Sequence, residues 1–375
     1  MAPLYSDFLS KHFSQLIKFG YGFLNPSSAW ASPAFCVPKS GANRSLQSVC
    51  DLRVSNSMMK RLSYPMPHLL SLGEYLSESA VFFTLDAFKG FWQIPISGDV
   101  ESQSMSTPIG IFTPNRLPQG NLNSVFIFQH AMDTIFRPTI SSNELLIWID
   151  DLFGHGPDPS SLLRTLRAVF ELCRKFRLKL NAARCNFFLL EAKWCGKIYF
   201  RGGWNHDPAR TSALRSMAQP RTAGDLMQFV CACTWLSSHI PDFARTIHPL
   251  RILLESLLKQ SKDRSKSSAR RIIVPVELWD ESVSVAFGNM LTALDNCVNL
   301  SHPRADMERC VFHDSSGDFC SVIITQVSTS ELSKPVAEQT HEPLAFYSKA
   351  FYWRCSPMVR ARKGGLRAYR NRRPL

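Results

Sequence analysis

Two stretches of the chain combine strand-like apolar runs with carboxylates. Residues 145–156 (LLIWIDDLFGHG) are an apolar run that meets Asp150 and Asp151 and continues through a second apolar pair into a Gly-rich turn. This pattern predicts a β-hairpin with both acids at its tip. Residues 81–96 (VFFTLDAFKGFWQIPI) form another strand-like run, broken by the single carboxylate of Asp86. Paired strands from these two runs would bring three carboxylates together.

The periodicity of the remaining segments predicts an α+β architecture. Residues 160–177 place apolar side chains at spacings near three and four, which indicates an amphipathic helix. A helix-like segment occupies 7–24, and residues 204–258 are expected to be helical. Strands and helices alternate across 30–203, a pattern that suits an antiparallel sheet with helices on one face.

Adjacent carboxylates repel one another unless a positive charge lies between them. Divalent cations such as Mg²⁺ take carboxylate oxygens, and two such ions about 3.5–4 Å apart form the clamp that polymerases and nucleases use. An isolated Asp-Asp pair is also a common turn sequence, so the pair alone does not decide between these interpretations.

A third motif, between the two acidic runs, carries a family resemblance. Residues 117–129 (LPQGNLNSVFIFQ) resemble the substrate-lining segment of reverse transcriptases, and from about residue 12 to about residue 355 the chain resembles gypsy-type LTR retrotransposon Pol polyproteins. The other segments that carry the resemblance are WASPAFCVPK (30–39), D-x-R-x-x-N (Asp51, Arg53 and Asn56), Y-P-M-P (64–67), W-I-D-D (148–151), LKLNAARCNFF (178–188), WCGKIYFRGG (194–203), HDPAR (206–210) and 220–254.

The resemblance implies a fold, a reaction and a set of site residues. The fold is a right-hand polymerase with fingers, palm and thumb, followed by a connection and an incomplete RNase H-like α/β domain. The reaction is RNA-directed DNA synthesis, with deoxynucleoside triphosphates added to a primer on an RNA or DNA template. The implied catalytic and metal-binding residues are Asp86, Asp150 and Asp151, which would hold two Mg²⁺ ions, with Mn²⁺ as an alternative.

The implied nucleotide-binding residues are Phe91, Gln119, Gly120, Lys39 and Arg53. Phe91 would exclude a 2′-hydroxyl, and Gln119 would line the base and sugar. Two of these positions have competing interpretations. Phe91 in an apolar strand is more often a core residue, and Arg53 beside an acid is often structural.

Several positions depart from the family pattern. Trp148 replaces the usual Tyr or Phe of the Y-x-D-D box, and its ring can still pack under the primer end. Leu46 and Gln47 stand where the family has Trp-Arg, so the charge that would contact the triphosphate is missing there. The nearby basic residues Arg44 and Lys39 are candidate substitutes.

The C-terminal part resembles an RNase H domain that has lost residues. Asp314 matches the first catalytic acid of such a domain, whereas Gly364 occupies the expected glutamate position and the sequence ends at Leu375. One aspartate cannot hold two ions, so we expect RNase H activity to be absent. The expected division is 1–29 as a lead-in, 30–203 as fingers and palm, 204–258 as thumb and connection, 259–275 as a basic linker, and 276–375 as the truncated RNase H-like domain.

The net charge of +13 comes from two stretches. Residues 259–271 hold six basic residues and one acid, and residues 354–375 hold eight basic residues and no acid. Such an excess favours phosphate backbones, although a solvated charge run or a nuclear address explains it equally well. The 11 cysteines show no zinc-finger spacing and no apolar run approaches 18 residues, so we expect an intracellular protein without a membrane span, in a cytoplasmic particle or the nucleus.

Two hypotheses follow from these observations. The chain is an RNA-directed DNA polymerase from a retrotransposon polyprotein, or it is a catalytically decayed relic with at most nonspecific nucleic-acid binding. Intact Asp86, Asp150, Asp151 and LPQG favour the enzyme, whereas Gln47 and Gly364 favour decay.

Overall fold

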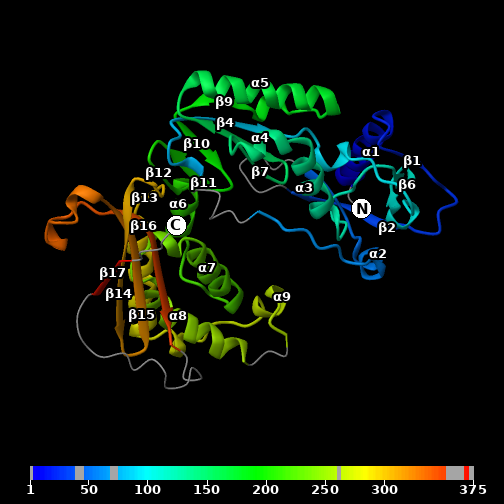
Figure 1. Ribbon diagram of the computed structural model, residues 1–375. Helices are drawn as coiled ribbons and strands as arrows, with labels where there is room; N and C mark the ends of the chain where they lie inside the picture. Colours follow the sequence, from blue (N-terminus) through cyan, green and yellow to red (C-terminus); the bar gives the residue numbers. More distant parts are fainter. Residues whose placement is uncertain (1–2, 39–45, 68–74, 260–262, 352–366, 371–375) are drawn as a thin grey trace. The chain divides into compact units, whose positions relative to one another are not determined.

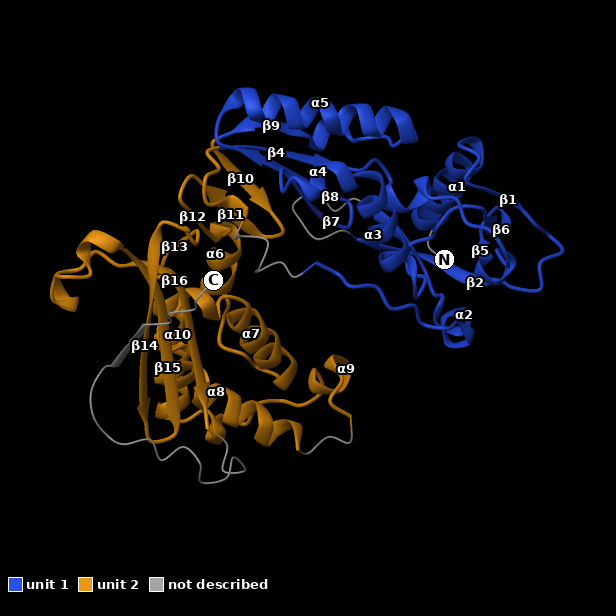
Figure 2. Cartoon of the chain, viewed as in Figure 1, with its two compact units in different colours: residues 1–72, 81–189 blue, residues 73–80, 190–375 orange. Residues whose placement is uncertain are grey.

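The structure is a computed structural model that describes residues 3–38, 46–67, 75–259, 263–351 and 367–370 (Figure 1). The chain divides into two compact units (Figure 2): the first comprises residues 1–72 and 81–189, and the second comprises 73–80 and 190–375. The division after residue 189 lies earlier than the expected end of the palm at 203. Every helix of the described residues is too short or too polar to cross a bilayer.

The first unit contains an antiparallel sheet in the order β7-β8-β4-β9. These strands are β7 (Leu145–Trp148), β8 (Asp151–Gly156), β4 (Val81–Asp86) and β9 (Asn186–Leu189). The helices α3 (Ser124–Ile135), α4 (Arg137–Ser141) and α5 (Pro159–Phe176) belong to the same unit, and α5 runs along the sheet in Figure 1. Apolar side chains of the central strands pack with those of α3 and α5 in one core, so this sheet has the predicted antiparallel pairing and a helical cover.

The predicted hairpin at 145–156 is confirmed, because β7 and β8 pair with a two-residue turn between them. The predicted amphipathic helix at 160–177 is also confirmed, as α5. The strand-like run at 81–96 differs from the expectation. Its strand ends at Asp86, and residues Gly90–Gln93 form the 3₁₀ turn η2. Lys89 adopts a left-handed backbone conformation just before this turn, which breaks the strand geometry.

A second sheet of the first unit has the order β1-β6-β5-β2-β3. Its strands are β1 (Gly22–Leu24), β6 (Gly110–Pro114), β5 (Met105–Thr107), β2 (Ser32–Pro38) and β3 (Leu46–Cys50). Helix α1 (Pro3–Lys18) packs on it through Leu9, Phe13 and Leu16, while the short α2 (Arg53–Met58) follows β3. The helix-like lead-in expected over 7–24 therefore ends at Lys18 and continues into β1.

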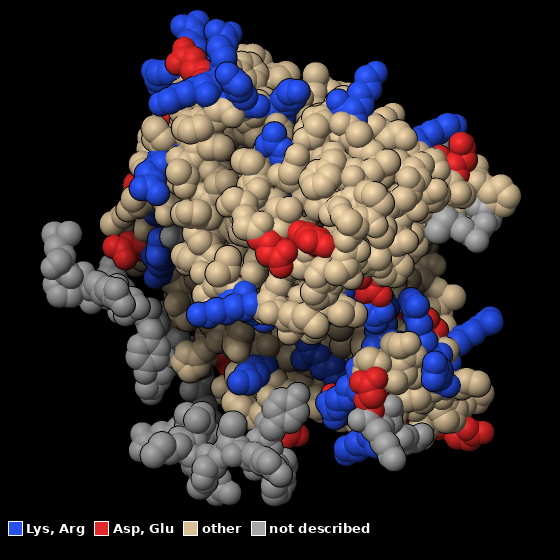
Figure 3. Space-filling model, turned by 90° about the vertical axis from the view of Figure 1, so that its right-hand side faces the viewer, with Lys and Arg blue, Asp and Glu red and all other residues tan. Residues whose placement is uncertain are grey.

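Basic side chains are also concentrated in the first unit, on α5. Figure 3 shows a group of Lys and Arg side chains at the top of one face, at the level of α5. The exposed basic residues of this helix are Arg164, Arg167, Arg174 and Lys175, with Glu171 among them. Local positive charge is therefore present outside the two stretches that account for the net charge.

The second unit begins with a sheet in the order β10-β11-β12-β13. These strands are β10 (Glu191–Trp194), β11 (Lys197–Phe200), β12 (Gly203–His206) and β13 (Leu300–Ser301). The helices that follow are α6 (Pro208–Arg215), α7 (Ala223–Trp235), α8 (Phe243–Leu258), α9 (Lys266–Ala269) and α10 (Glu281–Asp295). Apolar residues of α7, α8 and α10 share one core with Ala269. The basic stretch expected to be a linker is thus anchored in this core by a fully buried side chain.

The last sheet has the order β16-β15-β14-β17. Its strands are β16 (Glu342–Ala350), β15 (Phe319–Ser328), β14 (Met307–Ser316) and β17 (Arg367–Arg370). The amide N–H of Ala244, in the first turn of α8, donates to the Ser348 hydroxyl of β16 at 2.7 Å. Asp314 lies in β14 opposite Ser321 and is exposed. Gly364 lies outside the described residues, and the predicted absence of RNase H activity stays a prediction.

Close packing in the β7-β8-β4-β9 sheet requires a glycine at position 154. Gly154 of β8 lies opposite Phe83 of β4, and a Cβ at this position would overlap the Phe83 ring. We expect Gly154→Ala to lower the free energy of unfolding by about 3 kcal/mol, because overpacking forces the ring or the strands to move. Urea unfolding measures this. Gly288→Ala on α10, where nothing lies within 4 Å, should instead be neutral or stabilising. Equal stabilities of Gly154→Ala and wild type would contradict the prediction.

Two buried histidines in the second unit have lowered pKa values. His206 and His239 lie with ring centroids 4.3 Å apart, beside Trp204. Burial, followed by the charges of His239, Lys197 and Arg210, lowers the pKa of His206 to about 3, and burial lowers that of His239 to about 4. Both rings are therefore neutral in the folded state above those values.

This burial makes stability depend on pH. The unfolded chain binds protons near pH 6.5 and the folded chain does not, so stability falls as the pH drops from 7 toward 4. At pH 5, each histidine should lower the free energy of unfolding by about 2 kcal/mol relative to its value at pH 8. Urea unfolding of His206→Leu at both pH values should show a smaller difference than wild type. His130→Asn, an exposed position on α3, is the control. A pH dependence as steep as that of wild type would contradict the prediction.

Candidate active site

The three predicted carboxylates converge at one end of the β7-β8-β4-β9 sheet. Asp86, the last residue of β4, lies directly opposite Asp151, the first residue of β8. Asp150 occupies the two-residue turn that joins β7 to β8, and its carbonyl accepts a hydrogen bond from the Ala87 N–H at 3.2 Å. Strand pairing and turn geometry together therefore place all three acids side by side, as the sequence predicts.

The turn that carries Asp150 is strained, and a side chain of α3 holds it in place by a hydrogen bond. Ile149 has a φ of 57°, which is costly for a β-branched residue. Its N–H donates to Oε1 of Gln129 at 2.7 Å. Gln129 is fully buried in α3, and its Nε2 donates to Oδ1 of Asp133 at 2.8 Å. The hydroxyl of Tyr64 donates to the other oxygen of Asp133 at 2.5 Å. A chain of side chains thus fixes the turn that carries Asp150.

The sequence indicates these groups only in part. Tyr64 and Gln129 belong to family motifs that assign them no role, and no such motif includes Asp133. The Tyr64 hydroxyl is held in its protonated form, because burial and then the hydrogen bond to Asp133 raise its pKa to about 12. The spacing of Gln129 and Asp133, four residues apart on one helix, was the available signal.

The carboxylates repel one another. Burial, and then the charges of Asp150 and Asp86, raise the pKa of Asp151 to about 6. Burial also raises the pKa of Asp150. Asp86 has two polar neighbours: a guanidinium nitrogen of Arg184 lies 3.7 Å from its Oδ2, and the Asn181 amide donates to the same oxygen at 3.3 Å. No sequence motif assigns a role to either neighbour.

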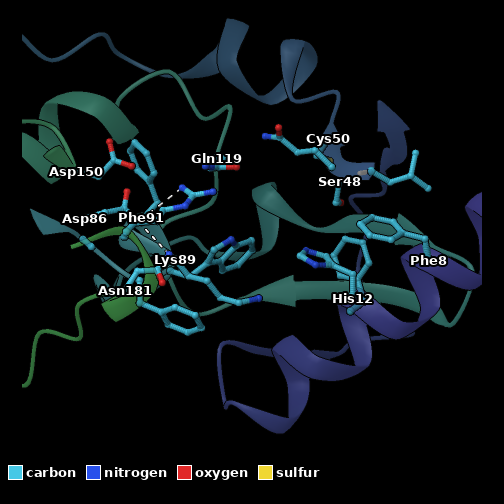
Figure 4. Close-up of a pocket in the computed structure, with 18 of the residues that line it drawn as sticks. Phe8, His12, Ser48, Cys50, Asp86, Lys89, Phe91, Gln119, Asp150 and Asn181 are labelled. Carbon is cyan, nitrogen blue, oxygen red and sulfur yellow. Dashed lines mark hydrogen bonds and ion pairs between the residues drawn. The ribbon is translucent and has the colours of Figure 1, made fainter. Parts of the chain in front are cut away.

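A cavity of about 560 Å³ opens beside the carboxylates (Figure 4). Asp86, Asp150, Phe91 and Gln119 line it. Phe91 lies in η2, not in a strand, and its ring packs against Phe128 at a centroid distance of 5.0 Å. Its partly exposed ring can therefore contact both the core and a ligand. The cavity is also lined by Phe8 and His12 of α1, and by Leu46, Gln47, Ser48 and Cys50 of β3.

The LPQG loop is tied to α2. Gly120 has a φ of 93° and its carbonyl accepts from the Asn56 amide at 2.9 Å, while the Asn56 oxygen accepts from the Leu122 N–H at 2.8 Å. Asn56 of the D-x-R-x-x-N motif thus positions the loop that carries Gln119.

Arg53 pairs with a neighbouring acid. Its guanidinium forms two hydrogen bonds with the Asp51 carboxylate, at 2.8 and 2.6 Å, and it is not among the described residues that line the cavity. Its role as a nucleotide contact stays a prediction. Lys39 and Arg44 lie outside the described residues.

The donors present fit a hard divalent cation that binds together with a phosphate. Among the described residues, no three His, Cys, Asp or Glu side chains are arranged to hold a metal ion on their own. Mg²⁺ at nucleotide sites commonly uses one or two carboxylates together with substrate phosphates. Asp86 and Asp150, both on the cavity wall and under like-charge repulsion, meet that requirement.

The family model described as "Reverse transcriptase (RNA-dependent DNA polymerase)" matches residues 37–212. Over these residues the chain is similar to reverse transcriptases. The retrovirus-related Pol polyprotein from transposon 412 of Drosophila melanogaster is 27% identical over 331 residues, which are 86% of this chain and 24% of that protein. The corresponding polyprotein from transposon gypsy is 25% identical over 327 residues, 86% of this chain and 31% of that protein. The chain thus spans roughly a quarter to a third of these relatives.

A solved structure shows the same fold. The foamy viral protease-reverse transcriptase in complex with double-stranded DNA matches 92% of this chain and 55% of its own, with a TM-score of 0.76 and 19% identity. The predicted polymerase fold is therefore confirmed, and so is the predicted kinship of the reverse transcriptase domain with retrotransposon Pol polyproteins.

Proposed function

We propose that the chain is an RNA-directed DNA polymerase that adds deoxynucleotides to a primer 3′-hydroxyl. The observation that carries this proposal is the convergence of Asp86, Asp150 and Asp151 beside a cavity of about 560 Å³, a volume typical of small-molecule sites. The relatives' family and the fold supply the reaction class.

Each part of the site has a role in this proposal. Asp86 and Asp150 would hold two Mg²⁺ ions, or Mn²⁺, and Asp151 would add negative charge beside them. When bound, the ions would lower the pKa of the primer hydroxyl and neutralise the leaving pyrophosphate. Gln119 would contact the base and sugar. The Phe91 ring, fixed by Phe128, would close the space beside the 2′ position.

The template would be RNA or DNA, paired with a primer. Related solved structures hold double-stranded DNA or an RNA/DNA hybrid, which supports a duplex as the partner of this chain. The duplex would be recognised mainly through its backbone and shape, because base pairing supplies the sequence information.

A primer-extension assay tests the proposal. The purified chain, a labelled primer on an RNA template, four deoxynucleoside triphosphates and Mg²⁺ should yield extended products. Folding is checked by circular dichroism, and template-primer affinity is measured separately. A folded chain that binds template-primer but extends nothing, with either Mg²⁺ or Mn²⁺, would overturn the proposal in favour of a decayed relic.

A further inference from the structure

Lys89 occupies a strained position next to the proposed catalytic residues. It lies three residues after Asp86, immediately before η2, with a φ of 49° and a ψ of 42°. This left-handed conformation is unfavourable for a residue with a side chain. Its carbonyl accepts from the Trp92 N–H at 2.8 Å, which closes the turn. Backbone strain of this kind is concentrated at functional sites, which makes Lys89 a candidate functional residue.

The side chain of Lys89 faces the cavity. It lines the same cavity as Asp86 and Asp150, and in Figure 4 it runs from the carboxylate end toward His12. The ammonium lies 5.7 Å from the centroid of the Phe19 ring. Its charge, after burial, helps lower the pKa of His12 to about 4, so His12 is neutral near pH 7. No ion pair found among the described residues includes Lys89.

The cationic side chains on the cavity wall differ in whether a carboxylate lies beside them. Of the described residues that line the cavity, two are cationic, Lys89 and Arg184. Arg184 already lies 3.7 Å from the Asp86 carboxylate. Gln47, at the position where the family resemblance implies an arginine, also lines the cavity and carries no charge. Lys89 is therefore the described cation of this cavity that has no carboxylate partner.

We propose that Lys89 binds the β- and γ-phosphates of the incoming nucleoside triphosphate. This inference rests on the proposed function, which places the α-phosphate beside Asp86 and Asp150. The polyphosphate would then extend along the wall toward the ammonium, away from the carboxylates that repel it. Lysine is a common phosphate ligand because its compact charge donates in several directions. The contact would supply, from the residue before η2, the charge that position 47 lacks.

Single-nucleotide incorporation kinetics test the role. Loss of a charge-assisted hydrogen bond of about 1.5–3 kcal/mol predicts a KM for the nucleotide that is roughly 10- to 100-fold higher in Lys89→Gln, with a much smaller change in kcat. Lys89→Gly removes the ammonium but suits the left-handed backbone, so it should show the same KM change in a stable fold. Lys89→Arg should recover part of the affinity.

Lys179→Gln is the matched control. Lys179 is exposed, and its carbonyl accepts from the N–H of Phe88, the residue before Lys89. It is not among the described residues lining the cavity. The nucleotide KM of Lys179→Gln should equal that of wild type, and template-primer affinity should be the same in all variants. An unchanged nucleotide KM in both Lys89→Gln and Lys89→Gly would overturn the proposal, as would a change confined to template-primer affinity.

A binding measurement separates this inference from the polymerase proposal. Isothermal titration with inorganic tripolyphosphate and Mg²⁺ requires no turnover. If wild type extends no primer, weaker tripolyphosphate binding by Lys89→Gly than by Lys179→Gln still supports the anion contact. Equal binding by those two variants overturns it, whatever the polymerase result.

Discussion

Asp150→Asn is expected to lower the rate of primer extension by roughly 10³-fold, equivalent to about 4 kcal/mol in the transition state. The substitution keeps the size of the side chain but removes a negatively charged oxygen from the cavity wall. A hard cation loses a carboxylate ligand, and the second, Asp86, cannot hold two ions alone. Single-turnover extension with saturating nucleotide measures the effect.

Two further measurements make this test specific. Asp158→Asn is the matched control, because Asp158 caps α5 in an exposed position and asparagine caps as well as aspartate. Template-primer affinity and the melting temperature of Asp150→Asn should not fall, since the change relieves repulsion among three acids. Extension within a few-fold of wild type would remove Asp150 from the mechanism.

Local signals in the sequence predicted the parts of the site that local geometry determines. The hairpin around Asp150 follows from two apolar runs joined by a two-residue turn, and the structure has both. The pairing of Asp86 with Asp151 is different in kind, because the strand register between β4 and β8 depends on contacts across 65 residues of chain. The order of family motifs, not periodicity, pointed to that pairing.

Residues that act through tertiary contacts were missed for physical reasons. Arg184 and Lys89 have no sequence pattern of their own, and they enter the site because a loop and a strained turn bring them to the cavity. Asp133 is an ordinary helical acid until Gln129 and Tyr64 are placed on either side of it.

The stretch expected to be a linker shows the same limitation. Composition marked 259–271 as a linker because Lys, Arg and Ser dominate it. The burial of Ala269 depends on a cap at Ser265 and on the core formed by α7, α8 and α10. A single small apolar residue within a charged run gives too weak a signal to predict that anchoring.

Gln129→Met is expected to lower the rate of the chemical step by roughly 10²-fold without a comparable change in nucleotide affinity. The substitution keeps the volume of the side chain but leaves the Ile149 N–H and one oxygen of Asp133 without their partner. The strained turn would then relax and displace Asp150, and a misplacement near 1 Å can cost about 10²-fold. The same loss should lower the free energy of unfolding by about 1–3 kcal/mol.

The division of this effect between rate and affinity distinguishes positioning from general destabilisation. Single-turnover kinetics should show the maximal rate falling while the nucleotide concentration at half-maximal rate stays near that of wild type. Tyr64→Phe, two hydrogen bonds further from the turn, should produce a smaller effect in the same direction. Gln15→Met, on the exposed side of α1, controls for the substitution itself. A Gln129→Met protein that is less stable yet extends primers at the wild-type rate would show that the turn holds Asp150 in place without Gln129.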